Sequence, residues 1–225
     1  MLNRKRENTY MMASTHRLGG LAAGIALSIA LAHKPEEAML ITDLSILGSL
    51  LPDIDNGNSS ISCNLPLTRL VVAIGQSTIR FICHFLPKKL RKPILCSIGH
   101  RGLSHSILGI VLFFFLTAGI SRSIGMETHI TMLASSAVSA GVTSHIVLDM
   151  LSGGSPLFCP VSTIRITLAR IKTGGVMEWV FRMVFLAVIV YRISIIAPSY
   201  INEIAAEYLS PYILQVTRFF QNLTF

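Results

Sequence analysis

The apolar residues of this chain lie in long runs rather than in the short stripes that fill the core of a soluble domain. The clearest run extends from Ile107 to Ile120 and contains Phe113, Phe114 and Phe115 in succession. Of the 225 residues, 52% are hydrophobic and only 13% are charged, which is too little charge for an ordinary soluble domain and too apolar for a disordered chain. The pattern predicts an all-α, multi-pass helical membrane protein.

Five segments are predicted to form membrane-associated helices: 18–33, 38–51, 103–120, 130–151 and 176–197. The first two are short, because at 1.5 Å per residue they reach only about 24 and 21 Å, whereas the hydrocarbon core of a bilayer is ~30 Å thick. They must extend into their flanks, thin the bilayer, or pair as a hairpin that does not fully cross. Gly20 and Gly24 form a G-x-x-x-G pattern, which predicts the close approach of another helix.

Lysine and arginine are distributed very unevenly between the loops. Residues 1–17, 52–101 and 152–175 hold four, seven and three of them, whereas 34–37, 121–129 and 198–225 hold one each. If all five segments cross the bilayer, the positive-inside rule places the first three regions in the cytoplasm and the C-terminal tail outside. A cleaved signal peptide is the alternative interpretation of residues 1–32, which begin with a basic segment and end in Ala30-Leu31-Ala32.

The loop 52–101 contains an amphipathic helix followed by a basic segment. Within 70–86, one helical stripe carries apolar residues and Thr78, and the opposite side carries Gln76, Arg80 and His84. The segment 87–93, with the sequence Pro-Lys-Lys-Leu-Arg-Lys-Pro, comes next. We therefore expect residues 69–92 to lie on anionic lipid head groups of the bilayer. No nucleic-acid partner is expected, because no aromatic stacking platform accompanies the charges.

Ionisable residues gather at the predicted cytoplasmic face. They are rare in membrane helices, because an Asp at the centre of a span costs about 2.5–3.5 kcal/mol on insertion scales. In the topology derived from lysine and arginine alone, seven of them fall on one side: His16, Asp53, Asp55, His100, His105, His145 and Asp149. The other histidines, His33, His84 and His129, have no partner at a useful spacing and are expected at the surface.

Two local spacings suit a metal site. His145 and Asp149 are four residues apart, so they project from one face of a helix and can reach a common ion. Asp53 and Asp55 follow Pro52, and an extended turn there would point both carboxylates the same way.

A bend is needed to bring the remaining two histidines of the set together. His100 and His105 are five residues apart, and Gly102 between them makes a bend easy. Three or four imidazoles with three carboxylates favour one or two divalent metal ions, with zinc preferred and manganese or iron as the alternatives. Two such ions would suit phosphoester hydrolysis, and Arg101 could bind phosphate oxygens in a forked geometry.

Several of these residues also have a purely structural interpretation. His16 taken alone could simply flank the start of a helix, and Asp53 and Asp55 could be turn formers. Arg101 could be no more than an anchor on the positive side of the membrane. His145 and Asp149 favour a function more strongly, because burying both in an apolar helix is costly.

Four motifs occur in the following order: Thr15-His16, Gly48-Ser49-Leu50-Leu51-Pro52-Asp53-Ile54-Asp55, His100-Arg101-Gly102-Leu103-Ser104-His105-Ser106 and Ser144-His145-Ile146-Val147-Leu148-Asp149. Over roughly residues 11–160, they resemble the YdjM family of predicted membrane-bound metal-dependent hydrolases. The resemblance implies the metal ligands Asp53, Asp55, His100, His105, His145 and Asp149, and His16 matches the family's N-terminal histidine. The family often continues with Thr and an aromatic-Gly turn, whereas this chain has Ser-Gly-Gly-Ser-Pro at 152–156, which leaves the pocket wall beyond Asp149 undefined.

The resemblance implies a metal-dependent hydrolase of the bacterial inner membrane, with its site in a domain over 1–160 and a C-terminal membrane helix and interfacial tail over 161–225. The ligand set is similar to that of helical zinc phospholipase C and P1 nuclease proteins, which favours a phosphoester as the substrate, and the position of the site at membrane level favours a lipid. Arg101 is then expected to stabilise charge on the substrate. The alternative function is non-catalytic divalent-metal binding or transport, for which polar residues should continue through the helices toward the far face. The run 107–116 lacks them.

Overall fold

The computed structural model describes residues 13–55, 66–87, 91, 94–95, 97–98, 101–172 and 174–196. In these ranges the chain forms six α-helices and two short 3-10 helices, and its only strand pairing is one isolated antiparallel bridge between Ser155 and Ile166. The all-α prediction is confirmed. The chain divides into two compact units, Met1–Phe185 and Leu186–Phe225, which are considered separately, and the site lies in the first.

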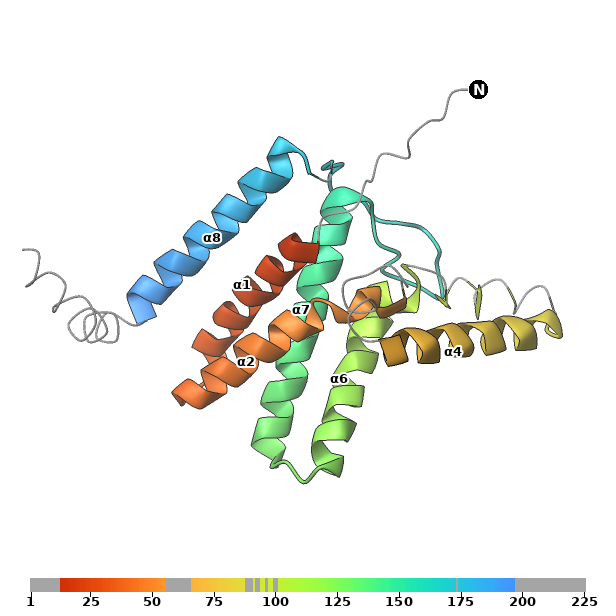
Figure 1. Cartoon of the computed structure of the whole chain (residues 1–225), viewed down its shortest axis with the longest axis horizontal. Coiled ribbons are helices and arrows are strands. Elements are labelled where there is room, and N and C mark those ends of the chain that lie inside the picture. Colours follow the sequence, from red (N-terminus) through yellow and green to blue (C-terminus); the bar gives the residue numbers. More distant parts are fainter. Residues whose placement is uncertain are drawn as a thin grey trace, which may run out of the picture. The chain divides into compact units, whose positions relative to one another are not determined.

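Helix α7 (Thr128–Ser152) is the central element of the first unit. It packs against α1 (Ala13–Leu31), α2 (Pro35–Gly48) and α6 (Ile107–Ser123), as Figure 1 shows. Its apolar side chains fill the core between these helices and include Leu133, Ala137, Val138, Val142 and Ile146, each at most 5% exposed. Because α7 is covered on several sides, residues on its last turns are held firmly inside the protein.

The pairing of α1 with α2 follows from the residues at the connection between them. Pro35 takes the first position of α2, where its missing N–H is not needed, and Glu36 and Glu37 complement the helix dipole in the first turn. The prediction from G-x-x-x-G is confirmed, since a Cβ atom on Gly24 would lie 2.8 Å from Thr42 Cα. Glycine at this position allows the two backbones to touch.

The predicted helix 103–120 is divided in the structure. Residues 103–105 form the 3-10 helix η2 (Leu103–His105), and α6 begins only after Ser106. Ser106 has an extended backbone, and its Oγ accepts a hydrogen bond from the N–H of Gly109 at 3.1 Å, which is the geometry of a helix N-cap. His105 therefore lies just before the helix, on a segment whose direction differs from that of α6.

One of the described helices, α7, is long and apolar enough to cross a membrane. About half of its most apolar window, 56%, is buried inside the protein. Helix α6 is apolar but shorter. The helices at the five predicted positions are present, but the prediction of five spans is not confirmed by their length and composition.

Two further helices flank the site region. Helix α4 (Pro66–His84) contacts the 3-10 helix η1 (Leu51–Asp55), and α8 (Val176–Ile196) follows the segment that leaves α7. Helix α4 is amphipathic as predicted, and its apolar side is exposed: Phe81 in the helix and Phe85 just after its end are 68% and 73% accessible. Cys83 on its other side is buried.

Candidate metal centre

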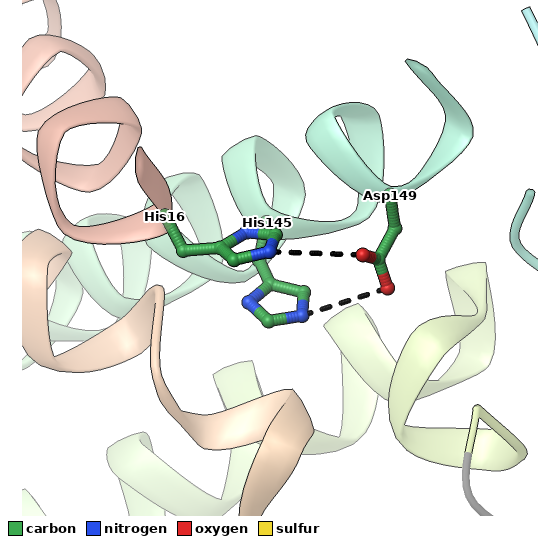
Figure 2. A group of neighbouring side chains, drawn as sticks. All are labelled: His16, His145 and Asp149. Carbon is green, nitrogen blue, oxygen red and sulfur yellow. Dashed lines mark ion pairs between the residues drawn. The ribbon is translucent and has the colours of Figure 1, made fainter. Parts of the chain in front are cut away.

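Five of the predicted site residues converge in the first unit. His16 comes from the first turn of α1, Asp53 from η1, His105 from the end of η2, and His145 and Asp149 from the last turns of α7. All are buried except Asp53, whose side chain is 28% exposed. Figure 2 shows the carboxylate of Asp149 beside the stacked rings of His16 and His145.

Two histidine nitrogens each lie close to two carboxylate oxygens. His105 Nε2 lies 3.3 Å from Asp149 Oδ2 and 3.6 Å from Asp53 Oδ1. His145 Nε2 lies 3.7 Å from Asp149 Oδ2 and 3.8 Å from Asp53 Oδ1. In a tetrahedral zinc site with bonds of about 2.0–2.1 Å, neighbouring ligand atoms are about 3.3–3.4 Å apart. These four nitrogen–oxygen distances are therefore close to those around one ion, although the four atoms do not all lie within 4.8 Å of one another.

Hydrogen bonds at Nδ1 of the two histidine rings orient their Nε2 atoms toward the carboxylates. His145 Nδ1 donates to the carbonyl oxygen of Ser49 at 2.6 Å, which leaves the lone pair on Nε2 facing the carboxylates. His105 Nδ1 lies 2.9 Å from Ser104 Oγ. Such outer partners fix the tautomer and the orientation of a metal-binding histidine.

His16 lies on the other side of Asp149. Its ring is stacked on that of His145, with centroids 3.9 Å apart, and its Nε2 lies 3.7 Å from Asp149 Oδ1. The potential ligands thus form two groups, His16 with His145 and Asp149, and Asp53 with His105 and His145. Because Nδ1 of His145 is engaged by Ser49, only Nε2 of this shared histidine can bind an ion. The described residues therefore fit one ion, and a second ion would need further ligands.

Buried polar atoms at the centre have no hydrogen-bond partner among the described residues. They are His16 Nδ1, His145 Nε2 and Asp149 Oδ2. A buried polar atom left without a partner costs about 1–3 kcal/mol, so its presence calls for an explanation. Two of these three atoms point into the group of four described above. The residues therefore fit a divalent metal ion, which would satisfy both atoms at once.

The charge of Asp53 is favoured by its surroundings. Burial acts to raise the pKa of its carboxyl group, but the neighbouring imidazoles of His105 and His145 outweigh burial and hold the pKa below its ordinary value. Asp53 is thus ionised at neutral pH, as a metal ligand must be.

Arg101 occupies the outer side of Asp149. Its Nη2 donates to Asp149 Oδ1 at 2.6 Å, its Nη1 donates to the carbonyl of Gly154 at 3.1 Å, and the residue is only 4% exposed. A buried guanidinium does not fit the interpretation as a surface anchor. The backbone of Arg101 is left-handed, with φ 58°, and Gly102, with φ −94° and ψ −125°, is neither helical nor extended, so both residues contribute to the bend before η2.

The segment after α7 forms the wall that the sequence left undefined. Besides the Gly154 carbonyl on Arg101, Ser155 Oγ donates to the carbonyl of His105 at 2.6 Å. The N–H of Ile107 also donates to the carbonyl of Leu157 at 3.0 Å. Residues 154–157 therefore hold in place both Arg101 and His105, the last residue of η2.

The structure contradicts the backbone conformation that was expected at Asp53 and Asp55. The extended turn predicted at Asp53 and Asp55 is wrong, because residues 51–55 form a 3-10 helix, in which residues two apart point in different directions. His100 and the side chain of Asp55 lie outside the described residues. Their predicted ligation therefore remains a prediction.

Sequence reasoning missed a buried cluster next to His16. Thr15 Oγ1 donates to Glu178 Oε1 at 2.5 Å and accepts from Arg182 Nε at 2.9 Å, which ties the first turn of α8 to that of α1. Glu178 is 1% exposed and also accepts from the N–H of Gly174 at 2.7 Å. The signal available in the sequence was a Glu and an Arg four residues apart in an apolar helix.

His33 and His129 are exposed as expected, but the expectation that they have no partners is wrong. His129 Nε2 lies 3.3 Å from Glu37 Oε1, and the two histidine rings are nearly parallel with centroids 6.2 Å apart. The helix ends that carry these residues meet only in the folded chain.

Comparison with known proteins agrees with the motif order. The chain is 28% identical to the protein named "Uncharacterized protein YvsG" of Bacillus subtilis (strain 168) over 174 residues, which cover 75% of this chain and 85% of the relative. No solved structure matches the chain. The family model described as YdjM inner membrane protein matches residues 11–221, beyond the region 11–160 that the motifs span. The chain therefore belongs to the YdjM family of inner membrane proteins.

Proposed function

We propose that this protein is a membrane-bound, metal-dependent hydrolase that cleaves a phosphoester, with a lipid as its substrate. The observation that carries the proposal is the approach of His105 Nε2 and His145 Nε2 to both Asp53 Oδ1 and Asp149 Oδ2, at 3.3–3.8 Å. Two imidazole nitrogens and two carboxylate oxygens suit zinc, which is usually held by four ligands, and manganese and iron are the alternatives.

The residues of the centre would have separate roles in the reaction. A divalent ion bound there supplies Lewis-acid chemistry, polarising a phosphoryl oxygen and activating water near neutral pH. The four residues named above hold the ion, and Ser49 holds the ring of His145 in place through its carbonyl. His16 on the second oxygen of Asp149, with Asp55 and His100 from the family motifs, would complete the ligand set or hold a second ion.

Arg101 is the proposed catalytic residue. It holds Asp149 by one oxygen and so directs the other oxygen to the group of four. From this place its permanent positive charge would stabilise negative charge on a phosphoryl group bound beside Asp149. Replacement by Lys keeps the charge but loses the forked geometry, so we expect Arg101→Lys to lower turnover while metal binding persists.

We further propose that the centre faces the cytoplasm from a multi-pass protein of the inner membrane. The support is the concentration of Lys and Arg in regions 1–17, 52–101 and 152–175, together with the inner-membrane family. The exposed apolar residues of α4, and the basic residues that follow it, suit a helix lying on anionic lipid. In this arrangement lipid head groups would be at the same level as the metal centre, which is the reason for proposing a lipid substrate. The domain over 1–160 would carry the site, and 161–225 a membrane helix and interfacial tail.

The second candidate function is transport of a divalent metal. A line of polar side chains on α7, Thr131, Ser135 and Ser139, runs from its first turns toward the centre, and the hydroxyls of Thr131 and Ser139 are buried with no hydrogen-bond partner among the described residues. Such a line is what a path for an ion would require. Metal uptake into proteoliposomes, measured with a fluorescent zinc indicator, would support transport, and its absence would exclude it.

Elemental analysis of the purified full-length protein tests the centre first. We expect bound zinc in the wild type, the loss of one equivalent in His145→Ala and in Asp149→Ala, and full retention in His84→Ala, which removes an exposed histidine of α4. Unchanged metal content in the first two variants would end both proposals. Metal-dependent release of a phosphorylated head group from phospholipid vesicles, abolished by chelator and by His145→Ala, is then the expected sign of the hydrolase.

A further inference from the structure

A second group of metal-ligating side chains lies at the opposite end of the same helices. His33 follows the end of α1, Glu37 lies in the first turn of α2, and His129 lies in the first turn of α7. Along α7, His129 is 16 residues before His145, which corresponds to about 24 Å at 1.5 Å per residue. The group is therefore independent of the centre built around Asp149.

Glu37 is held in place as a ligand would be. Its residue is only 8% exposed, its Oε2 accepts from the N–H of His33 at 2.8 Å, and its Oε1 lies 3.3 Å from His129 Nε2. One oxygen is thus used to fix the carboxylate, and the other faces an imidazole. This is the arrangement in which a hydrogen-bonded carboxylate presents its second oxygen to an ion.

The two histidine rings are near each other, but at least one side chain must turn before the three residues can bind one ion, because their ligand atoms do not all lie within 4.8 Å of one another. Their ring centroids are 6.2 Å apart and the rings are inclined by only 17°. The centre of an imidazole lies about 3.2 Å from an ion bound to its nitrogen, so two rings on a tetrahedral ion have centres about 5.2 Å apart. His129 has a side chain that is 51% exposed, so it can rotate by the remaining 1 Å or so without disturbing the core.

Space for an ion and its water ligands is present beside the group. A pocket of about 310 Å³ is lined by both histidines together with Met132 and Ser136. Its opening to the surface would let an ion exchange, in contrast to the buried centre at the other end of α7. Two nitrogens and a carboxylate oxygen, with positions left for water, are a ligand set that zinc and copper(II) both accept.

We propose that His33, Glu37 and His129 form a second, exchangeable site for a divalent transition-metal ion such as zinc. The site needs only these three side chains, and it stands whether or not the centre around Asp149 is catalytic. In the membrane orientation proposed above, it would take up the ion on the side away from the cytoplasm.

Zinc titration of the full-length protein in detergent, after removal of metal by chelator, tests the site by calorimetry. We expect wild type to bind one equivalent more than the double variant His33→Asn/His129→Asn, and His84→Asn to match wild type. The variant Glu37→Gln keeps an acceptor for the N–H of His33, so it should fold and bind the same equivalent at least tenfold more weakly. His145→Asn should lose the buried site and keep this one, which separates the two proposals.

The proposal is overturned if the double variant binds as many equivalents as His84→Asn, or if His145→Asn abolishes all zinc binding in protein that retains its helical circular dichroism. If the double variant fails to fold, the affinity of Glu37→Gln decides, and an affinity equal to that of wild type refutes the site.

Discussion

Replacing Gly141 by Ala tests whether close helix packing sets the geometry of the buried centre. Gly141 lies on α7 one turn before His145, against the end of α2. A Cβ atom there would lie 2.0 Å from the carbonyl oxygen of Ser45 and 2.7 Å from the backbone nitrogen of Ser49. Both are backbone atoms, so no side-chain rotation can relieve the contact.

The size of the effect follows from these distances. Ordinary contact begins at 3.4 Å, so α2 must move away from α7 by about 1.4 Å at this point. Overpacking of this kind costs about 1–3 kcal/mol of unfolding free energy. The carbonyl of Ser49 would move with α2 and lengthen its 2.6 Å hydrogen bond to His145 Nδ1. Loss of such an outer partner lowers metal affinity by about 10–100-fold.

The matched control is Gly119→Ala on α6, where a Cβ atom meets nothing within 4 Å. Thermal unfolding in detergent and zinc affinity by competition with a chromogenic chelator would be measured for both variants. We expect Gly119→Ala to keep both properties or gain slightly in stability, since Ala favours helix over Gly by up to about 1 kcal/mol. If Gly141→Ala bound zinc as tightly as Gly119→Ala, the reasoning that links helix contact to ligand orientation would be refuted.

Three other results are expected. Arg101→Gln removes the guanidinium partner of the buried Asp149 carboxylate, so the unfolding free energy should fall by about 3–5 kcal/mol in metal-free protein and by less at saturating zinc. An equal loss in both states would contradict the proposed ion. Thr15→Val removes the hydroxyl that joins Glu178 to α1, so stability should fall by about 1–3 kcal/mol in thermal melts, and an unchanged melting temperature would argue against the cluster. Chelator should lower the melting temperature of wild type more than that of His145→Asn, which lacks the buried ion, because an ion present at 100 times its Kd adds about 2.7 kcal/mol; equal shifts in the two proteins would contradict the buried site.

The helices could be predicted from sequence because each one coincides with an apolar run. The observed bounds of α1, α2, α7 and α8 differ from the predicted ones by a few residues. The predicted helix at 103–120 failed at its start, where Ser106 as an N-cap outweighs the apolar residues around it. Spanning a membrane is a different question from forming a helix, and among the described helices only α7 meets the requirement by length and composition.

The metal centre was partly predictable for a local reason. His145 and Asp149 are one turn apart on one helix, and that relation is fixed by helix geometry alone. The pairing of Arg101 with Asp149, and the hydrogen bond from His145 to the Ser49 carbonyl, join segments about 50 and 100 residues apart, so they depend on how the helices pack. The contact of His129 with Glu37 was missed for the same reason, since nothing near either residue indicates the other.

The left-handed backbone of Arg101 has a consequence for how the site assembles. Arg101 is the one non-glycine residue with a positive φ in the described part of the chain, a conformation that costs roughly 1–2 kcal/mol. Its guanidinium can offset that cost only by reaching Asp149 and Gly154. The loop that delivers His105 is therefore stable in its bent form only once α7 and the segment behind it are in place. Loop closure and completion of the ligand set should be a single cooperative event rather than two successive ones.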